Sequence, residues 1–193
     1  MKSFHVSIPA SLKLDAKSAK RVKLFNQTIA NITAAEAELD GLTEQAREPQ
    51  LQGARVLELA DQLKASRLDA LRAKLRVAVE GKALLVDLLA IAKAGEQAAQ
   101  DHHDQVVADA GARLEASGWQ PQNRPDLKSR APEVFKRALL EQGSLTPEAT
   151  AAKAPIGELK SFAGWLTDTM KEVNRFITDT DQQVSNQLNA ILR

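Results

Sequence analysis

The tetrad Asp101-His102-His103-Asp104 contains the residue types that come closest to a metal site in this sequence. Imidazole and carboxylate groups are common metal ligands. On a helix, however, ligands that share a metal lie three or four residues apart, whereas adjacent His102 and His103 point about 100° apart. Only Asp101 and Asp104 share a face, and His5 is the single further histidine. We therefore expect a solvated polar face here, and no metal or other cofactor.

The chain offers few groups for catalysis. It has no cysteine, no tyrosine and three histidines, so a cysteine nucleophile is excluded and few of the usual acid–base groups are present. It contains no glycine-rich phosphate loop, no Gly-x-Ser-x-Gly turn and no His-Glu-x-x-His motif. The sequence predicts that the protein is not an enzyme.

Two basic stretches offer contacts to phosphate groups. In the first, Lys13, Lys17, Lys20 and Arg21 lie near one face at helical spacing, which suits a nucleic-acid backbone. The second stretch lies between residues 64 and 76. No aromatic residue is interleaved with the first, and the net charge of the whole chain is +1. Solvated helix faces are the default interpretation, with nucleic acid as an alternative partner.

Helices must position these side chains. Ala and Leu together make up 57 of the 193 residues, against 9 glycines and 7 prolines, and both residue types favour helix strongly. The fold class is predicted to be all-α. We expect one elongated antiparallel bundle or coiled coil of three to four long helices, with short helices in a proline-rich connector.

Residues 1–12 have a different pattern and are predicted to form an extended N-terminal arm. Phe4, Val6 and Ile8 alternate with polar residues, and Pro9 ends the alternation. These three apolar residues are candidates for a protein interface in which the arm adds to a sheet in another molecule. The alternative is a tail that lies on the bundle of its own chain.

A long helical hairpin is expected over residues 13–118, and its first helix is divided in charge. Its apolar stripe is interrupted only by Glu36 and consists of Val22, Phe25, Ile29, Ile32 and Leu39. Residues 1–25 carry six positive charges and one negative charge, whereas residues 26–50 carry one positive and five negative charges. This order would be complementary in an antiparallel contact with a second copy. A solvated face of incidental polarity is the alternative.

The second part of the hairpin, residues 50–117, contains no proline. A near-helical phase runs through Leu57, Leu68, Leu71, Leu75, Val79, Val86 and Leu89. We favour one continuous helix of about 100 Å; the alternative is two helices hinged at Gly81, where no capping residue stands nearby. Gly118 is expected in a left-handed C′ position, with Trp119 placed to pack on Leu114.

Residues 119–156 form the proline-rich connector. Pro132 suits a first helical turn, and a small apolar face continues from there to Gly143. Thr146 is expected to cap a second short helix, which Pro155 would end. The final helix is then predicted over residues 157–193.

This last helix has the most regular pattern, a heptad repeat with steps of four and three residues. Its seam includes polar Thr180 and Gln187 and the candidate interface residues Leu166, Met170, Val173, Ile177, Val184 and Ile191. The seam is predicted to mediate self-association, with packing inside the monomer as the alternative.

The function class favoured by these features is a non-catalytic helical assembly module that binds protein through coiled-coil faces. The partner would be a second copy or a larger assembly, such as a virion or a secretion machine. A second alternative is a membrane-active helical protein that hides the apolar residues 83–92, although a spanning helix needs about 20 apolar residues. No apolar run follows the N-terminal residues, which favours the cytoplasm or the interior of a virion or other particle.

Overall fold

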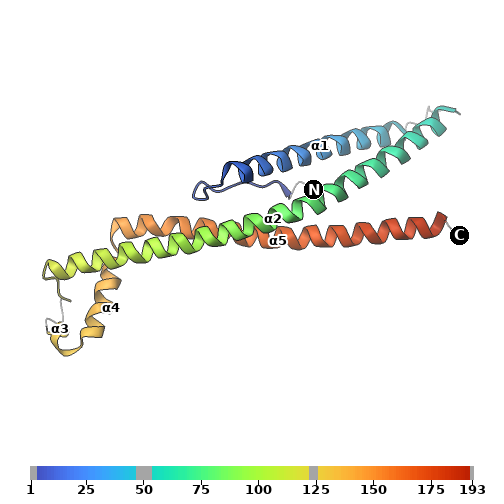
Figure 1. Cartoon of the computed structure of the whole chain (residues 1–193). Helices are drawn as coiled ribbons and strands as arrows, with labels where there is room; N and C mark the ends of the chain where they lie inside the picture. Colours follow the sequence, from blue (N-terminus) through green and yellow to red (C-terminus); the bar gives the residue numbers. More distant parts are fainter. Residues whose placement is uncertain (1–3, 47–53, 122–125, 192–193) are drawn as a thin grey trace. The chain divides into compact units, whose positions relative to one another are not determined.

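A computed structural model of the chain describes residues 4–46, 54–121 and 126–191, and the side chains of residues 46, 54, 56, 68 and 183–191 lie outside the description. In these residues all secondary structure is helical, which confirms the all-α class (Figure 1). The three long helices are α1 (Ala16–Ala46), α2 (Ala54–Ala116) and α5 (Pro147–Ile191). The two short helices are α3 (Leu127–Arg130) and α4 (Pro132–Gly143).

The chain forms two compact units, and α2 and α5 each contribute to both of them. Unit 1 consists of Met1–Ile8, Lys13–Leu89 and Trp165–Arg193. Unit 2 consists of Pro9–Leu12 and Ala90–Gly164.

In unit 1, α1 and the first part of α2 lie side by side and antiparallel (Figure 1). Arg21, early in α1, donates from Nη1 to Oδ2 of Asp87 at 2.6 Å. Glu36, later in α1, forms an ion pair with Lys74, earlier in α2. Glu36, which interrupts the apolar stripe of α1, is therefore paired with a lysine of the neighbouring helix.

The apolar stripe of α1 forms its buried face, as the spacing predicts. Val22, Phe25, Ile29 and Ile32 are all buried. The helix begins at Ala16, three residues after the predicted start of the hairpin, because Asp15 caps it. Oδ1 of Asp15 accepts the backbone N–H of Ser18 at 2.7 Å, which satisfies one of the free donors of the first turn.

Helix α2 continues without a break through Gly81, which confirms one helix in place of a hinged pair. The predicted apolar phase of α2 is wrong, however, because Leu57, Val79 and Val86 are exposed. The buried hydrophobic residues of its unit 1 part are Leu59, Leu63, Val77, Ala78, Leu84, Leu85 and Leu88. Apolar residues occur on several faces of this helix, so its packing neighbours decide which face is buried.

The C-terminus of α2 is a Schellman motif, as predicted. Gly118 has φ of +76°, and its N–H donates to the carbonyl of Glu115 at 3.0 Å. The N–H of Trp119 donates to the carbonyl of Leu114 at 3.0 Å. Leu114 and Trp119 both pack against a small core cluster in unit 2, formed by Leu127, Phe135 and Leu139.

Helix α4 begins at Pro132 and ends at Gly143, as predicted. Its last residue lies against the backbone of α2: a β-carbon at Gly143 would stand 2.7 Å from the carbonyl oxygen of Val107. Glycine at position 143 therefore permits a close approach of α4 and α2 within unit 2.

The predicted end of a short helix at Pro155 is wrong. Thr146 caps the helix through a hydrogen bond from the N–H of Ala149 to its Oγ1 at 3.3 Å, but α5 then runs through Pro155 to Ile191. The last helix thus begins ten residues before the predicted position 157. An interior proline costs about 3 kcal/mol. Ala149 before it and Leu159 after it are buried, so both parts of the helix are packed within the chain.

Candidate functional site

An open groove of about 580 Å³ lies between α1 and α2 in unit 1. We refer to it as the α1–α2 groove. Its apolar lining includes buried Phe25, Ile32, Val77 and Leu84 and exposed Leu24. Leu24 has 63% of its surface exposed, so the groove leaves a large apolar side chain uncovered by its own chain.

Two faces of α1 contribute to the groove, since Phe25 and Ile32 of the buried stripe also line it. The buried stripe, which includes Val22 and Ile29, faces the core of unit 1. A second face, turned by about one residue around the helix, holds Leu24, Thr28 and Asn31 and lines the groove. On α2, small Ala73 and large Leu84 line the opposite wall.

Charged residues border this apolar lining. Arg21, Arg76 and Glu80 are all part of the groove wall. Nε of Arg76 donates to Oε1 of Glu80 at 2.9 Å, and this hydrogen bond raises the pKa of Arg76 above its ordinary value. An apolar floor with a charged border suits one face of an amphipathic helix.

The predicted phosphate contacts lie at the start of α1 and just before it. Lys13, Lys17 and Lys20 are exposed and make no ion pair with the residues that the structure describes. Arg21 is half-buried and already paired with Asp87. Three of the four residues thus remain available to an anion, and a role in nucleic-acid binding stays a prediction.

The N-terminal arm lies on its own chain. The backbone N–H of Val6 donates to Oδ1 of Asn26 at 2.9 Å, and Nδ2 of Asn26 donates to the carbonyl of Val6 at 2.8 Å. The Asn26 amide thereby takes the place of a neighbouring strand. Phe4 and Val6 are buried and Ile8 is half-buried, so their role as an interface with another chain stays a prediction.

The α5 seam is used within the chain wherever its side chains are described. Leu166 and Val173 are 0% and 1% exposed, and Met170 and Ile177 are half-buried. Polar Thr180 of the same seam is also buried. The burial of Leu166 and Val173 favours the intramolecular alternative for these two residues, and self-association through the seam stays a prediction. The side chains of Val184, Gln187 and Ile191 lie outside the described residues.

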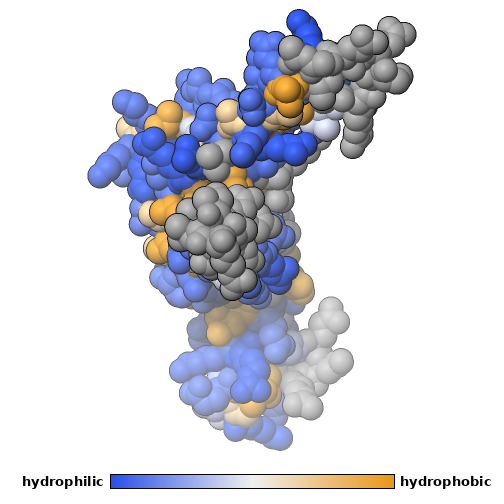
Figure 2. Space-filling view, turned by 90° about the vertical axis from the view of Figure 1, so that its right-hand side faces the viewer, coloured by the Kyte–Doolittle hydropathy of each residue, from blue (hydrophilic) through white to orange (hydrophobic). Residues whose placement is uncertain are grey.

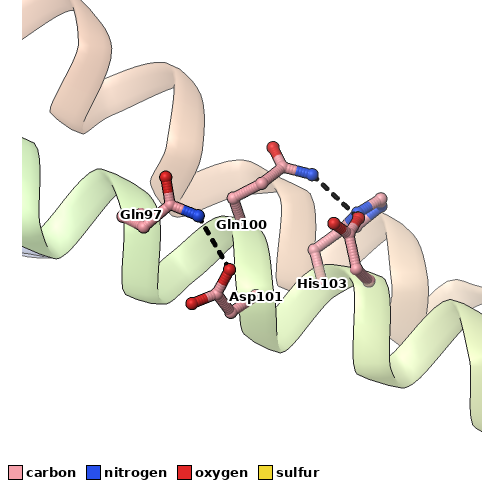
Figure 3. Close-up of polar contacts among 5 residues, drawn as sticks. Gln97, Gln100, Asp101 and His103 are labelled. Atoms are coloured by element: carbon pink, nitrogen blue, oxygen red, sulfur yellow. Dashed lines mark hydrogen bonds and ion pairs between the residues drawn. The ribbon is translucent and has the colours of Figure 1, made fainter.

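The Asp101–Asp104 tetrad forms part of a ladder of side-chain hydrogen bonds along α2 (Figure 3). Nε2 of Gln97 donates to Asp101, and Nε2 of Gln100 donates to Asp104, each at 2.8 Å. Nδ1 of His103 lies 3.3 Å from Oδ1 of Asp104. Within the described part of the chain, no three His, Cys, Asp or Glu side chains are grouped to hold a metal.

The apolar segment 83–92 belongs mainly to the core. Leu84, Leu85, Leu88 and Ala92 are buried, whereas Val86 is exposed. Over the residues that the structure covers, no helix has the length and apolarity needed to cross a membrane. On the face shown in Figure 2, hydrophilic residues cover most of the surface and hydrophobic ones occur as separate patches.

The α1–α2 groove was not predicted from the sequence, because only one apolar stripe was identified on α1. A signal was present: steps of four and three residues run from Lys17 through Leu24 and Ala35 to Leu42. Only Leu24, Ala35 and Leu42 of this second series are apolar, and polar Thr28 and Asn31 lie in its middle, so its apolar pattern is weak.

Comparison with known proteins gives no match to a protein family, to a curated protein or to a solved structure.

Proposed function

We propose that the protein is a non-catalytic helical assembly module, and that the α1–α2 groove is its protein-binding surface. The observation that carries this proposal is exposed Leu24 at the edge of a groove floored by buried Phe25 and Val77. An apolar concavity that continues into exposed apolar surface is typical of a binding site.

The groove fits a helix better than an extended segment. Its two walls are themselves antiparallel helices, and a third helix can place side chains between the ridges of both. An extended segment would need a sheet edge for its backbone hydrogen bonds. The described residues contain no strand to provide one.

The α5 seam supports the same assignment by elimination. Leu166 and Val173 are buried in the single chain, so these seam residues cannot contact a partner without unfolding their own unit. We therefore place assembly on a surface other than these two residues, and the α1–α2 groove offers apolar area that is already exposed.

A photo-crosslinking amino acid at Ala73, in the groove, tests the proposal in cells that express the chain. The matched control carries the same amino acid at Val79, which is exposed elsewhere on α2. We expect a covalent protein adduct at position 73 and none at position 79. The adduct partner, identified by mass spectrometry and purified, should bind the chain and lose affinity for the Ala35→Glu variant.

Absence of a specific protein adduct at position 73 would contradict the proposal. An adduct partner that binds the Ala35→Glu variant with unchanged affinity would also place the binding surface elsewhere.

A further inference from the structure

We infer that the face of α1 which lines the groove binds α1 of a second copy of this chain in antiparallel orientation. This inference rests on the proposed function and names its partner. We define the α1 stripe as the positions reached from Lys17 to Leu42 in steps of four and three residues. Such spacing keeps one continuous face along a helix that pairs with another helix.

The α1 stripe is not the face that its own chain covers. The residues of α1 with little exposure are those of the other stripe, for example Val22 and Ile29. On the α1 stripe, Lys17, Leu24 and Ala35 are exposed, and Thr28 is half-buried. The stripe thus presents a surface of helical length to an external partner.

Charge decides the orientation of the partner. Lys17 and Lys20 are exposed at the beginning of α1, and Glu38 and Asp40 are exposed at its end. None of these four residues is ion-paired to a described residue. A parallel second copy would bring like charges together, whereas an antiparallel copy brings each basic end to an acidic end.

Charge and side-chain size also indicate a register, with a two-fold axis between Thr28 and Asn31. Arg21 then lies opposite Glu38 of the second copy, and Leu24 lies opposite Ala35 of the second copy. Large side chains thus face small ones. Because the contact is isologous, each pair forms twice.

The polar residues of the α1 stripe fit this register. The hydroxyl of Thr28 donates to the carbonyl of Leu24 at 2.9 Å, and its lone pairs remain able to accept. The side-chain amide of Asn31 from the second copy can donate to them. Arg21 uses Nη1 for Asp87, and its guanidinium has further N–H groups for Glu38 of the second copy.

Other occupants fit the α1 stripe less well. A nucleic acid or a uniformly acidic helix would be attracted to Lys17 and repelled by Glu38 at the other end. A uniformly basic helix would be attracted to Glu38 and repelled by Lys17. A second copy carries both signs in the required order, which is the reason for choosing it.

The solution mass of the full chain over a concentration series tests the inference. We expect twice 21.0 kDa at high concentration, with dissociation favoured by salt because exposed charges contribute. Leu24→Asp should raise the dimer dissociation constant at least about tenfold, since the substitution acts twice. Val79→Asp, at an exposed site away from the stripe, is the matched control and should leave the constant unchanged.

Charge exchange and cross-linking test the orientation. Glu38→Arg should weaken the dimer. Adding Arg21→Glu together with Asp87→Arg, which keeps the internal ion pair with its signs exchanged, should restore it. The chain has no cysteine, so single cysteines report contacts directly. A mixture of Thr28→Cys and Asn31→Cys chains should form a mixed disulfide faster than Leu24→Cys forms one with itself.

Two outcomes would overturn the inference. One is a monomer at all concentrations; the other is a dimer that tolerates Leu24→Asp. Either result leaves the proposed function intact if the adduct at position 73 identifies a different protein. Loss of that adduct together with a monomeric chain would overturn both.

Discussion

The ring of Phe25 lies directly against Gly81. A β-carbon at position 81 would stand 2.8 Å from Cζ of this ring, well inside van der Waals contact. Gly81 therefore marks the point where α1 and α2 approach each other in unit 1, inside an unbroken helix. Gly81, which was the alternative position for a hinge, instead leaves space for the ring of Phe25.

Replacing Gly81 by alanine tests this contact. Alanine gains about 1 kcal/mol of helix propensity, but the overlap with Phe25 is expected to cost about 1–3 kcal/mol. The free energy of unfolding, measured by urea titration and circular dichroism, should therefore fall. Gly41→Ala is the control, because nothing lies within 4 Å of a β-carbon there, and it should stabilise the chain. Equal stabilisation by both variants would argue against the close approach.

Truncation of the α5 seam tests whether the seam belongs to the core. Leu166 is fully buried, so Leu166→Ala should lower the free energy of unfolding by about 2–5 kcal/mol. The solution mass should not change at a concentration where the variant is folded. Glu172→Ala, on the exposed side of the same helix, is the control. A variant that keeps its stability but dissociates would make the seam an interface between chains.

The Asp15 cap predicts a pH dependence of helix α1. The side-chain hydrogen bond from Ser18, its backbone hydrogen bond and the charges of Lys17 and Arg21 together hold the pKa of Asp15 below its ordinary value of 3.8. A carboxyl group with a depressed folded-state pKa stabilises the fold above its unfolded-state pKa and loses that contribution as the pH falls through the folded-state value.

Asp15→Asn isolates this effect, since asparagine also caps helices but does not titrate. The difference in urea midpoint between the natural chain and the variant should be constant above about pH 5 and should shift against the natural chain below about pH 4. The range from about pH 6 to about pH 2.5 covers the titration of an aspartate. A difference in urea midpoint that stays constant over this range would show that the cap is not formed.

The Glu36–Lys74 ion pair predicts a measurable coupling between α1 and α2. Its side chains are only 33% and 24% exposed, so solvent screens the pair less than an open surface pair. A double-mutant cycle with Glu36→Gln and Lys74→Gln should give a coupling of about 0.5–1 kcal/mol.

The control cycle uses Asp69 and Arg72, an exposed pair within α2 alone. Its coupling should be close to zero because exposed pairs contribute little. If both cycles gave the same value, the contact between the two helices at this point would be in doubt.

Much of the secondary structure was predictable because its signals are local. Gly118 followed by Trp119 ends α2 through hydrogen bonds to residues three to five positions earlier. Pro132 and Gly143 bound α4. The buried stripe of α1 follows from its spacing, since most of the large apolar residues of that helix occur on one side.

Tertiary structure decided the remaining features, because they depend on what packs against each residue. Pro155 lies inside α5 between buried Ala149 and buried Leu159, and the buried face of α2 includes Leu85 and Leu88 in place of Val79 and Val86. The candidate site belongs to this second class. A groove forms where two helices meet, so the spacing of residues along α1 alone could not show that Leu24 stands exposed beside Val77.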